Sequence, residues 1–159
     1  MEISEGICLE DSDRIEEILE STGYFYDFEI RTAIEIAEQT IAEGMEGSGY
    51  FWLKVTDEDK ILAFATYGKN EFSTHSWELY WIAVHQDHRN RKLGKGLLKA
   101  IEDDIRKKGG KIIWIETSGR PLYLPTESFY IRNGYELQAS LKDFYGPDDP
   151  KQIYAKVLQ

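Results

Sequence analysis

The stretch from Trp77 to Ile105 constrains the fold most strongly, because a strand pattern leads through one short loop into a helix pattern. WELYWIAV is rich in aromatic and β-branched residues, which is typical of a strand. Apolar residues then recur at helical spacing, at Leu93, Leu97, Leu98, Ile101 and Ile105. A strand that passes directly into an amphipathic helix indicates a sheet covered by helices. We therefore predict a fold that mixes α and β elements.

The rest of the chain repeats these two patterns. In chain order we expect strand 2–10, helix 14–22, a helix after GYFYDFE that ends at Gly44 and Gly47, strands 50–55, 60–67 and 77–84, helix 93–108, strand 111–117, helix 126–133 and two strands around GPDDP. This β-α-α-β-β-β-α-β-α-β-β order predicts an α/β (α+β) fold with a mixed central sheet flanked by helices. The 159 residues suit a single domain, 1–159. KIIWIET, residues 111–117, is almost wholly apolar, which predicts a strand covered on both faces.

The acidic composition narrows the range of partners. A formal net charge of −10 disfavours nucleic acid or a membrane as the main partner, because phosphate surfaces bind positively charged proteins. We see neither an apolar run of roughly 20 residues, as a membrane span requires, nor a signal-peptide pattern, and we expect a cytoplasmic protein. The single cysteine, Cys8, excludes an internal disulfide, and its apolar neighbours favour a buried structural thiol.

A cluster of positive charge contrasts with this acidity. Five of the nineteen Lys and Arg residues lie in the eleven positions from Arg89 to Lys99, with no acid among them. They stand where a helix begins, and the partial positive charge of a helix N-terminus disfavours cations unless an anion joins them. A phosphate or pyrophosphate fits, because Gly94 and Gly96 have no side chains to block a ligand from the backbone N–H groups. Composition alone also allows a solvated basic face.

The same stretch resembles a known family. WIAVHQDHRNRKLGKGLLKAIE is similar to the central signature of the GNAT superfamily of acyl-CoA-dependent N-acetyltransferases. The pyrophosphate loop of that family follows the pattern Arg/Gln-x-x-Gly-x-Gly/Ala, which Arg91, Gly94 and Gly96 match. Asn90 and Lys92 stand where glycines are frequent, so the turn is expected to differ slightly. Downstream, FYIRNGYEL resembles the second signature of the family, and the matching element order covers almost the whole chain.

The resemblance implies acetyl-CoA as cofactor and a set of residues that bind it. In the family, the pantetheine arm pairs with the strand before the loop, and a backbone N–H at the end of that strand faces the thioester oxygen. Here that donor is the N–H of Val84. The implied cofactor-binding residues are Ile82, Ala83, Val84, Arg89, Arg91, Lys92, Leu93, Gly94, Lys95 and Gly96.

Two further residues match catalytic positions of the family. Glu78 resembles the glutamate that acts as general base in some members, and regular alternation would place it on the same strand face as Val84. An exposed glutamate without a role is the alternative. Tyr130, in FYIRNGY, matches the tyrosine often assigned as general acid near the cofactor sulfur. The alternative is a core aromatic residue whose hydroxyl finds any hydrogen-bond partner.

The segment STGYFYDFE lies where the family usually builds its acceptor pocket. The candidate substrate-binding residues are Tyr24, Tyr26, Asp27 and Glu29, whose aromatic and acidic groups suit an apolar, cationic amine. Packing of an aromatic loop onto the domain would explain the same residues. The histidines, at positions 75, 85 and 88, have no metal-ligand spacing, and we expect them at the surface without a role and no metal in the site.

These observations predict an N-acetyltransferase that transfers an acetyl group from acetyl-CoA to a primary amine of a small molecule or peptide, by direct attack in a ternary complex. One alternative is a non-catalytic acyl-CoA-binding sensor. A second alternative, a nucleic-acid binder, conflicts with the net charge. The sequence leaves the oligomeric state open, with a homodimer among the alternatives.

Overall fold

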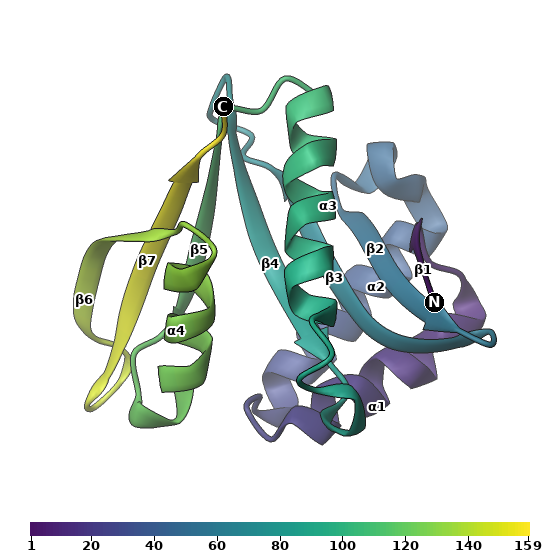
Figure 1. The fold of residues 1–159 in the computed structure, drawn as a ribbon, viewed down its shortest axis with the longest axis horizontal. Helices are drawn as coiled ribbons and strands as arrows, with labels where there is room; N and C mark the ends of the chain where they lie inside the picture. Colours follow the sequence, from purple (N-terminus) through teal and green to yellow (C-terminus); the bar gives the residue numbers. More distant parts are fainter. The chain divides into compact units, whose positions relative to one another are not determined.

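The computed structural model describes residues 1–159 (Figure 1). Its helices and strands are β1 (Glu2–Glu5), α1 (Ser12–Thr22), α2 (Asp27–Ser48), β2 (Phe51–Asp57), β3 (Lys60–Lys69), β4 (Ser76–Val84), α3 (Leu93–Lys107), β5 (Ile112–Ser118), α4 (Leu124–Arg132), β6 (Glu136–Gly146) and β7 (Asp149–Val157). The predicted order of elements is therefore confirmed. The seven strands form one mixed sheet in the order β1-β2-β3-β4-β5-β7-β6. None of the helices combines the length and apolar composition needed to cross a membrane.

The chain forms two compact units. The first unit comprises residues 1–68 and 80–103, and the second comprises residues 69–79 and 104–159. Strand β4 and helix α3 each contribute residues to both units.

In the first unit, β1, β2 and β3 pair antiparallel in chain order. The predicted hairpin of β2 and β3 turns through Glu58 and Asp59, whose φ angles of 49° and 66° are both left-handed. Two consecutive left-handed residues give the turn whose twist matches that of paired strands.

The core of the first unit lies between the sheet and the helices α1 and α2. Buried residues recur three and four positions apart on each helix, at Ile15, Ile18 and Leu19 and at Ile30, Ala33 and Ala37. They pack against Trp52 and Phe64 of the sheet, whose rings stack 5.6 Å apart. In Figure 1, α3 covers the opposite face of these strands.

Three local predictions differ from the structure. Gly44 interrupts α2 with a non-helical φ of 80° and ψ of 167°, but the helix resumes and ends only at Gly49. The first strand stops at Glu5, because a 3-10 helix, Leu9–Asp11, follows it. Cys8 precedes that short helix and is exposed rather than buried, and its Sγ lies 3.4 Å from a carboxylate oxygen of Asp11.

In the second unit, β4 pairs parallel with β5 from Ser76 opposite Ile112 to Leu79 opposite Ile115. Strand β7 pairs antiparallel with both β5 and β6. Ile113 and Ile115 of β5 are buried, whereas the alternate residues are half-buried or, at Glu116, exposed. The prediction that this strand is covered on both faces is therefore wrong, because the second unit places its α4 helix on only one of them.

Candidate active site

The basic loop lies between β4 and α3 in the first unit. After β4 ends at Val84, a 3-10 helix, Gln86–His88, precedes the start of α3 at Leu93. Asn90 and Lys92 adopt φ angles of 63° and 61°, in the left-handed region that glycine favours. The two residues that replace frequent glycines therefore still take a glycine-like backbone conformation.

The N-terminus of α3 offers backbone donors. The N–H groups of a helix's first turn have no partner within the helix, which here concerns Leu93, Gly94 and Lys95. The N–H of Gly96 instead donates to the carbonyl oxygen of Lys92 at 3.1 Å. The free donors therefore precede Gly96, at which a Cβ atom would lie 3.8 Å from Cδ1 of Ile3.

Most of the positive charge around this helix start has no acidic partner. Lys99 forms an ion pair with Asp103 at 3.4 Å. Arg91 contacts a neutral group, since its Nη1 lies 2.9 Å from Nδ1 of His88. Desolvation, and then the charge of Arg91, lower the pKa of His88, which favours a neutral ring that accepts this hydrogen bond. Arg91, Lys92 and Lys95 are exposed and remain suited to an anion.

Arg89, unlike the other cations of the loop, contacts residues at the end of α1 and just after it. Its Nη2 donates to the carbonyl oxygen of Thr22 at 3.1 Å, and its guanidinium lies 5.5 Å from the centre of the Tyr24 ring. Both partners belong to the end of α1 and the segment after it. The implied role of Arg89 as a cofactor ligand therefore competes with contacts that its side chain already makes.

The second half of β4 does not alternate regularly. Tyr80 lies against Gly68 and forms an edge-to-face contact with Tyr50, on the side of the sheet that α1 and α2 cover. Trp81 packs against the same core, and Ala83 is part of it. Neighbouring Tyr80 and Trp81 thus share a side, as happens at a β-bulge.

This interruption changes the prediction for Glu78. Glu78 precedes the interruption and alternates regularly with Tyr80, so its side chain lies on the same face as Tyr80. Ile82 and Val84 follow the interruption and alternate with Trp81 and Ala83, so their side chains lie on the opposite face. The expectation that Glu78 and Val84 share one face is therefore wrong.

Tyr130 lies in a cluster of buried aromatic residues in the second unit. Its side chain is 5% exposed, and its ring centre lies 6.0 Å from that of Tyr135 and 5.9 Å from that of Tyr154. Burial, followed by the nearby Tyr154 and Tyr123, raises the pKa of Tyr130 well above its ordinary value. Burial and the charge of Glu127 raise the pKa of Tyr154 to about 12. Both hydroxyls therefore keep their protons at neutral pH.

Glu78 and Tyr130 lie on opposite faces of the second unit's sheet. Glu78 is half-buried and pairs with Trp114, whereas Tyr130 packs on Tyr154, which pairs with Ile115. Since successive residues of β5 face opposite sides, the two candidate groups do not meet on one face.

The candidate acceptor segment has several structural roles. Glu29 accepts a hydrogen bond from the Tyr26 N–H at 3.1 Å and so caps α2, while Phe25 packs into the core. Tyr26 and Phe28 stack with ring centres 5.5 Å apart and remain 49% and 64% exposed. The sequence interpretation missed Phe28, although an aromatic residue on either side of Asp27 is visible in YDF.

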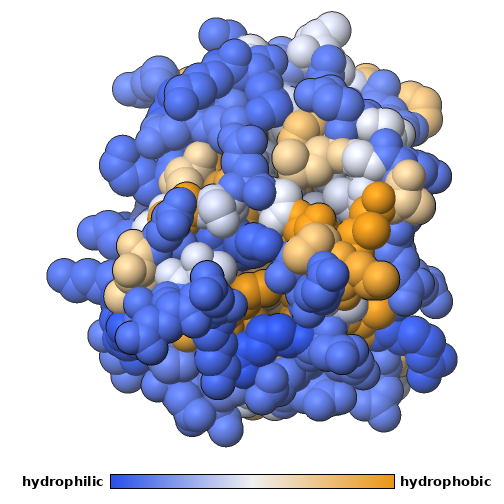
Figure 2. All heavy atoms as spheres, turned by 90° about the vertical axis from the view of Figure 1, so that its right-hand side faces the viewer, coloured by the Kyte–Doolittle hydropathy of each residue, from blue (hydrophilic) through white to orange (hydrophobic).

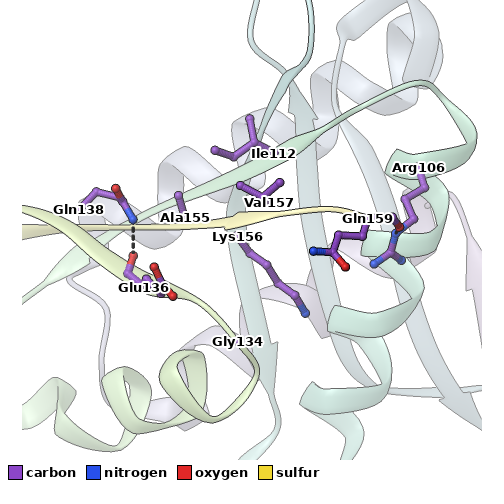
Figure 3. A pocket seen from close by; sticks show the side chains of 9 residues that line it. All are labelled: Arg106, Ile112, Gly134, Glu136, Gln138, Ala155, Lys156, Val157 and Gln159. Atoms are coloured by element: carbon purple, nitrogen blue, oxygen red, sulfur yellow. Dashed lines mark hydrogen bonds between the residues drawn. The ribbon is translucent and has the colours of Figure 1, made fainter.

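A separate pocket of about 430 Å³ lies in the second unit (Figure 3). Figure 3 shows Lys156 extending from β7 and Arg106 from α3. Each donates to a backbone carbonyl at 3.0 Å, Lys156 to Asn133 and Arg106 to Gln159. None of the predicted site residues lines this pocket.

Residues 13–135 match the Acetyltransferase (GNAT) family, and the chain belongs to this family. The resemblance identified from the sequence is therefore confirmed.

Individual relatives show how far the likeness extends. The [ribosomal protein bS18]-alanine N-acetyltransferase of Escherichia coli K12 is 26% identical over 116 residues, which cover 73% of this chain and 74% of that protein. The enzyme of the same name from Salmonella typhimurium is 33% identical over 73 residues, which cover 46% of this chain and 47% of that protein. That match spans about half the length of the Salmonella protein.

Solved structures share the fold over the full chain. A GNAT-family protein from Desulfovibrio desulfuricans aligns with a TM-score of 0.96 and 32% identity over 99% of both chains. An aminoglycoside 6'-N-acetyltransferase solved with coenzyme A aligns with a TM-score of 0.78 and 21% identity over 100% of this chain and 98% of that chain. At 21% identity, the likeness to the aminoglycoside enzyme concerns the fold alone.

Proposed function

We propose that this protein transfers an acetyl group from acetyl-CoA to a primary amine by direct attack in a ternary complex, with residues 1–159 acting as one N-acetyltransferase domain. The observation that carries the proposal is the loop before α3. It combines a glycine-like backbone at Asn90 and Lys92 with three exposed cations at a helix start. Membership of the GNAT family supports the same conclusion.

The loop suits a pyrophosphate group. The free N–H groups at the start of α3 would donate to its oxygens, and Arg91, Lys92 and Lys95 would balance its charge. Ile82, Ala83 and Val84 would pair with the pantetheine arm. When bound, acetyl-CoA supplies an activated acetyl thioester.

The chain supplies proton transfer and charge stabilisation. In this proposal the N–H of Val84 stabilises negative charge on the acetyl oxygen, and Glu78 accepts a proton from the amine. Tyr130, which holds its proton at neutral pH, donates it to the departing thiolate. Because Glu78 and Tyr130 act on different atoms, their positions on opposite sheet faces are compatible with both roles.

Replacing Glu78 with glutamine tests the general base. We expect Glu78→Gln to lower kcat/KM by about 100-fold at low pH and less as the pH approaches the pKa of an alkylamine, about 10, where the acceptor has already lost its proton. Glu116→Gln is the matched control, because this exposed glutamate of β5 lies on the same sheet face as Glu78. A pH–rate profile measures both variants. A wild-type profile for Glu78→Gln would remove its catalytic role.

The acceptor should be cationic. Residues 1–48 contain fourteen acidic and two basic side chains. Their net charge of −12 is larger in magnitude than the −10 of the whole chain. Hydrophilic side chains dominate the face shown in Figure 2, with apolar patches between them. Within this acidic region, Asp27 stands in the sequence between Tyr26 and Phe28, whose exposed rings stack on each other. An acidic group beside aromatic rings attracts positively charged amines.

A panel of amines tests this acceptor class. The relatives named above act on an alanine of a ribosomal protein and on aminoglycosides, so the panel should contain both peptides and small amines. With release of free thiol as the readout, doubly cationic amines should show kcat/KM about tenfold above amines that carry a carboxylate, and the difference should shrink as salt screens the charges. Asp27→Asn should reduce the difference, and Asp148→Asn in the β6–β7 turn should not. Equal turnover of both kinds of amine at low salt would contradict the proposal.

The panel also separates catalysis from binding alone. Acetyl-CoA binding without thiol release from any amine would favour the non-catalytic sensor. We further propose a cytoplasmic location, because the exposed free thiol of Cys8 suits a reducing compartment.

A further inference from the structure

Two segments far apart in the sequence meet within the first unit. The Gln86 N–H donates to Oγ of Ser21 at 3.2 Å, and Arg89 donates to the carbonyl oxygen of Thr22 at 3.1 Å. The Arg89 guanidinium also lies over the ring of Tyr24, 5.5 Å from its centre. The segment that leads into the basic loop is therefore attached to the connection between α1 and α2.

The contact with Thr22 suits a cation for a local reason. Thr22 is the last residue of α1, and the final carbonyl groups of a helix lack intrahelical partners and carry partial negative charge. Gly23 then reverses the chain in a left-handed conformation, with φ of 72°, and the Tyr24 N–H donates to Oγ1 of Thr22 at 3.2 Å. Arg89 thus contacts both sides of this reversal.

The residues that follow the reversal form the candidate acceptor segment. Phe25 is anchored in the core, and the exposed pair of Tyr26 and Phe28 comes directly after it. Thr22 and Tyr24 precede these rings by only a few residues, so Arg89 contacts the chain where it enters this segment. Arg89 is a side chain that contacts both residues.

We propose that Arg89 is a positioning residue that attaches the α1–α2 connection to the loop before α3, so that binding of acetyl-CoA at the loop strengthens binding of the amine acceptor. The proposal rests on the proposed function, which assigns the cofactor and the acceptor to these two segments. It gives Arg89 a role different from that of Arg91, Lys92 and Lys95. Coupling of this kind is reciprocal, so a bound acceptor also strengthens acetyl-CoA binding.

Kinetics and binding of two variants distinguish this role from a phosphate contact. We expect Arg89→Ala to raise the acceptor KM by about tenfold, the scale of one charge-assisted hydrogen bond, with kcat and the acetyl-CoA Kd within about twofold of wild type. Arg89→Lys should behave like Arg89→Ala, because lysine keeps the charge but lacks the planar group that contacts Thr22 and Tyr24 together. Lys99→Ala, which removes another cation from the same region, is the control and should leave all three quantities unchanged.

A measurement without turnover keeps the two proposals separable. Amide hydrogen exchange of residues 22–28 should be about tenfold faster in Arg89→Ala and in Arg89→Lys than in wild type, and unchanged in Lys99→Ala. If the wild type acetylates no amine, the proposed function fails, while the exchange rates still decide whether Arg89 orders this segment. Wild-type exchange in both variants would overturn the inference, as would a weakened acetyl-CoA Kd in Arg89→Ala that Arg89→Lys restores.

Discussion

Replacing Tyr130 with phenylalanine should lower kcat by about 100-fold, the usual scale of general acid catalysis, while the affinity for acetyl-CoA stays within about twofold. The buried hydroxyl keeps its proton at neutral pH because burial raises its pKa, and it is needed only when the thiolate departs. The ring itself packs against Tyr135 and Tyr154, and phenylalanine preserves that packing. Steady-state kinetics and calorimetric titration with acetyl-CoA measure the two quantities.

Tyr154→Phe is the matched control for this experiment. Tyr154 belongs to the same aromatic cluster and is fully buried, and Glu127 is the charged group beside its hydroxyl. Removing the Tyr154 hydroxyl should leave kcat unchanged, because phenylalanine preserves the ring packing and the proposed mechanism assigns this hydroxyl no step. If Tyr130→Phe also retained full turnover, the general acid would have to be another group, and correct positioning of the amine against the thioester would supply most of the rate.

Replacing Gly94 with glutamate should abolish binding of acetyl-CoA. In wild type, ligand at about 100 times its Kd stabilises a protein by about 2.7 kcal/mol, which raises the Tm of a chain of this size by roughly 5–10 °C. Gly94 lies in the first turn of α3, where a glutamate side chain would place bulk and negative charge among the free N–H groups. Thermal denaturation with and without acetyl-CoA measures the shift, which should vanish.

The apo form of this variant should remain folded. Glutamate is a better helix former than glycine, and its charge is favoured at a helix N-terminus. Gly47→Glu, at an exposed position in α2, makes the same exchange away from the loop and should keep the full shift. A full shift in a folded Gly94→Glu protein would show that the pyrophosphate binds elsewhere.

The element order could be predicted because it depends on local patterns. Apolar residues three and four positions apart on α1 and α2, and the hairpin of β2 and β3, are encoded within short windows of sequence. The interruption of alternation between Tyr80 and Trp81 could not be predicted. It depends on which core each side chain joins, and that core contains residues from distant elements such as Phe64.

Only part of the candidate site could be predicted from the sequence. The motif located the loop, but it did not predict the left-handed backbone of Asn90 and Lys92, which residues other than glycine adopt only where the surrounding fold holds them. The target of Arg89 could not be deduced, since Thr22 lies 67 residues away in the chain. The capping role of Glu29 was visible in principle, because a glutamate three residues after the N-cap residue, here Tyr26, is a known local pattern.

The left-handed conformations of Asn90 and Lys92 have a consequence for the entropy of cofactor binding. Each costs roughly 1 kcal/mol relative to glycine, so the loop is held in this shape by the surrounding fold at the expense of stability. In return, a chain without glycine at these positions samples fewer backbone states than one with glycine. The loop backbone therefore loses less conformational entropy when an anion binds. The ordering of the loop is therefore largely completed during folding, and the association step with acetyl-CoA carries a smaller entropic penalty.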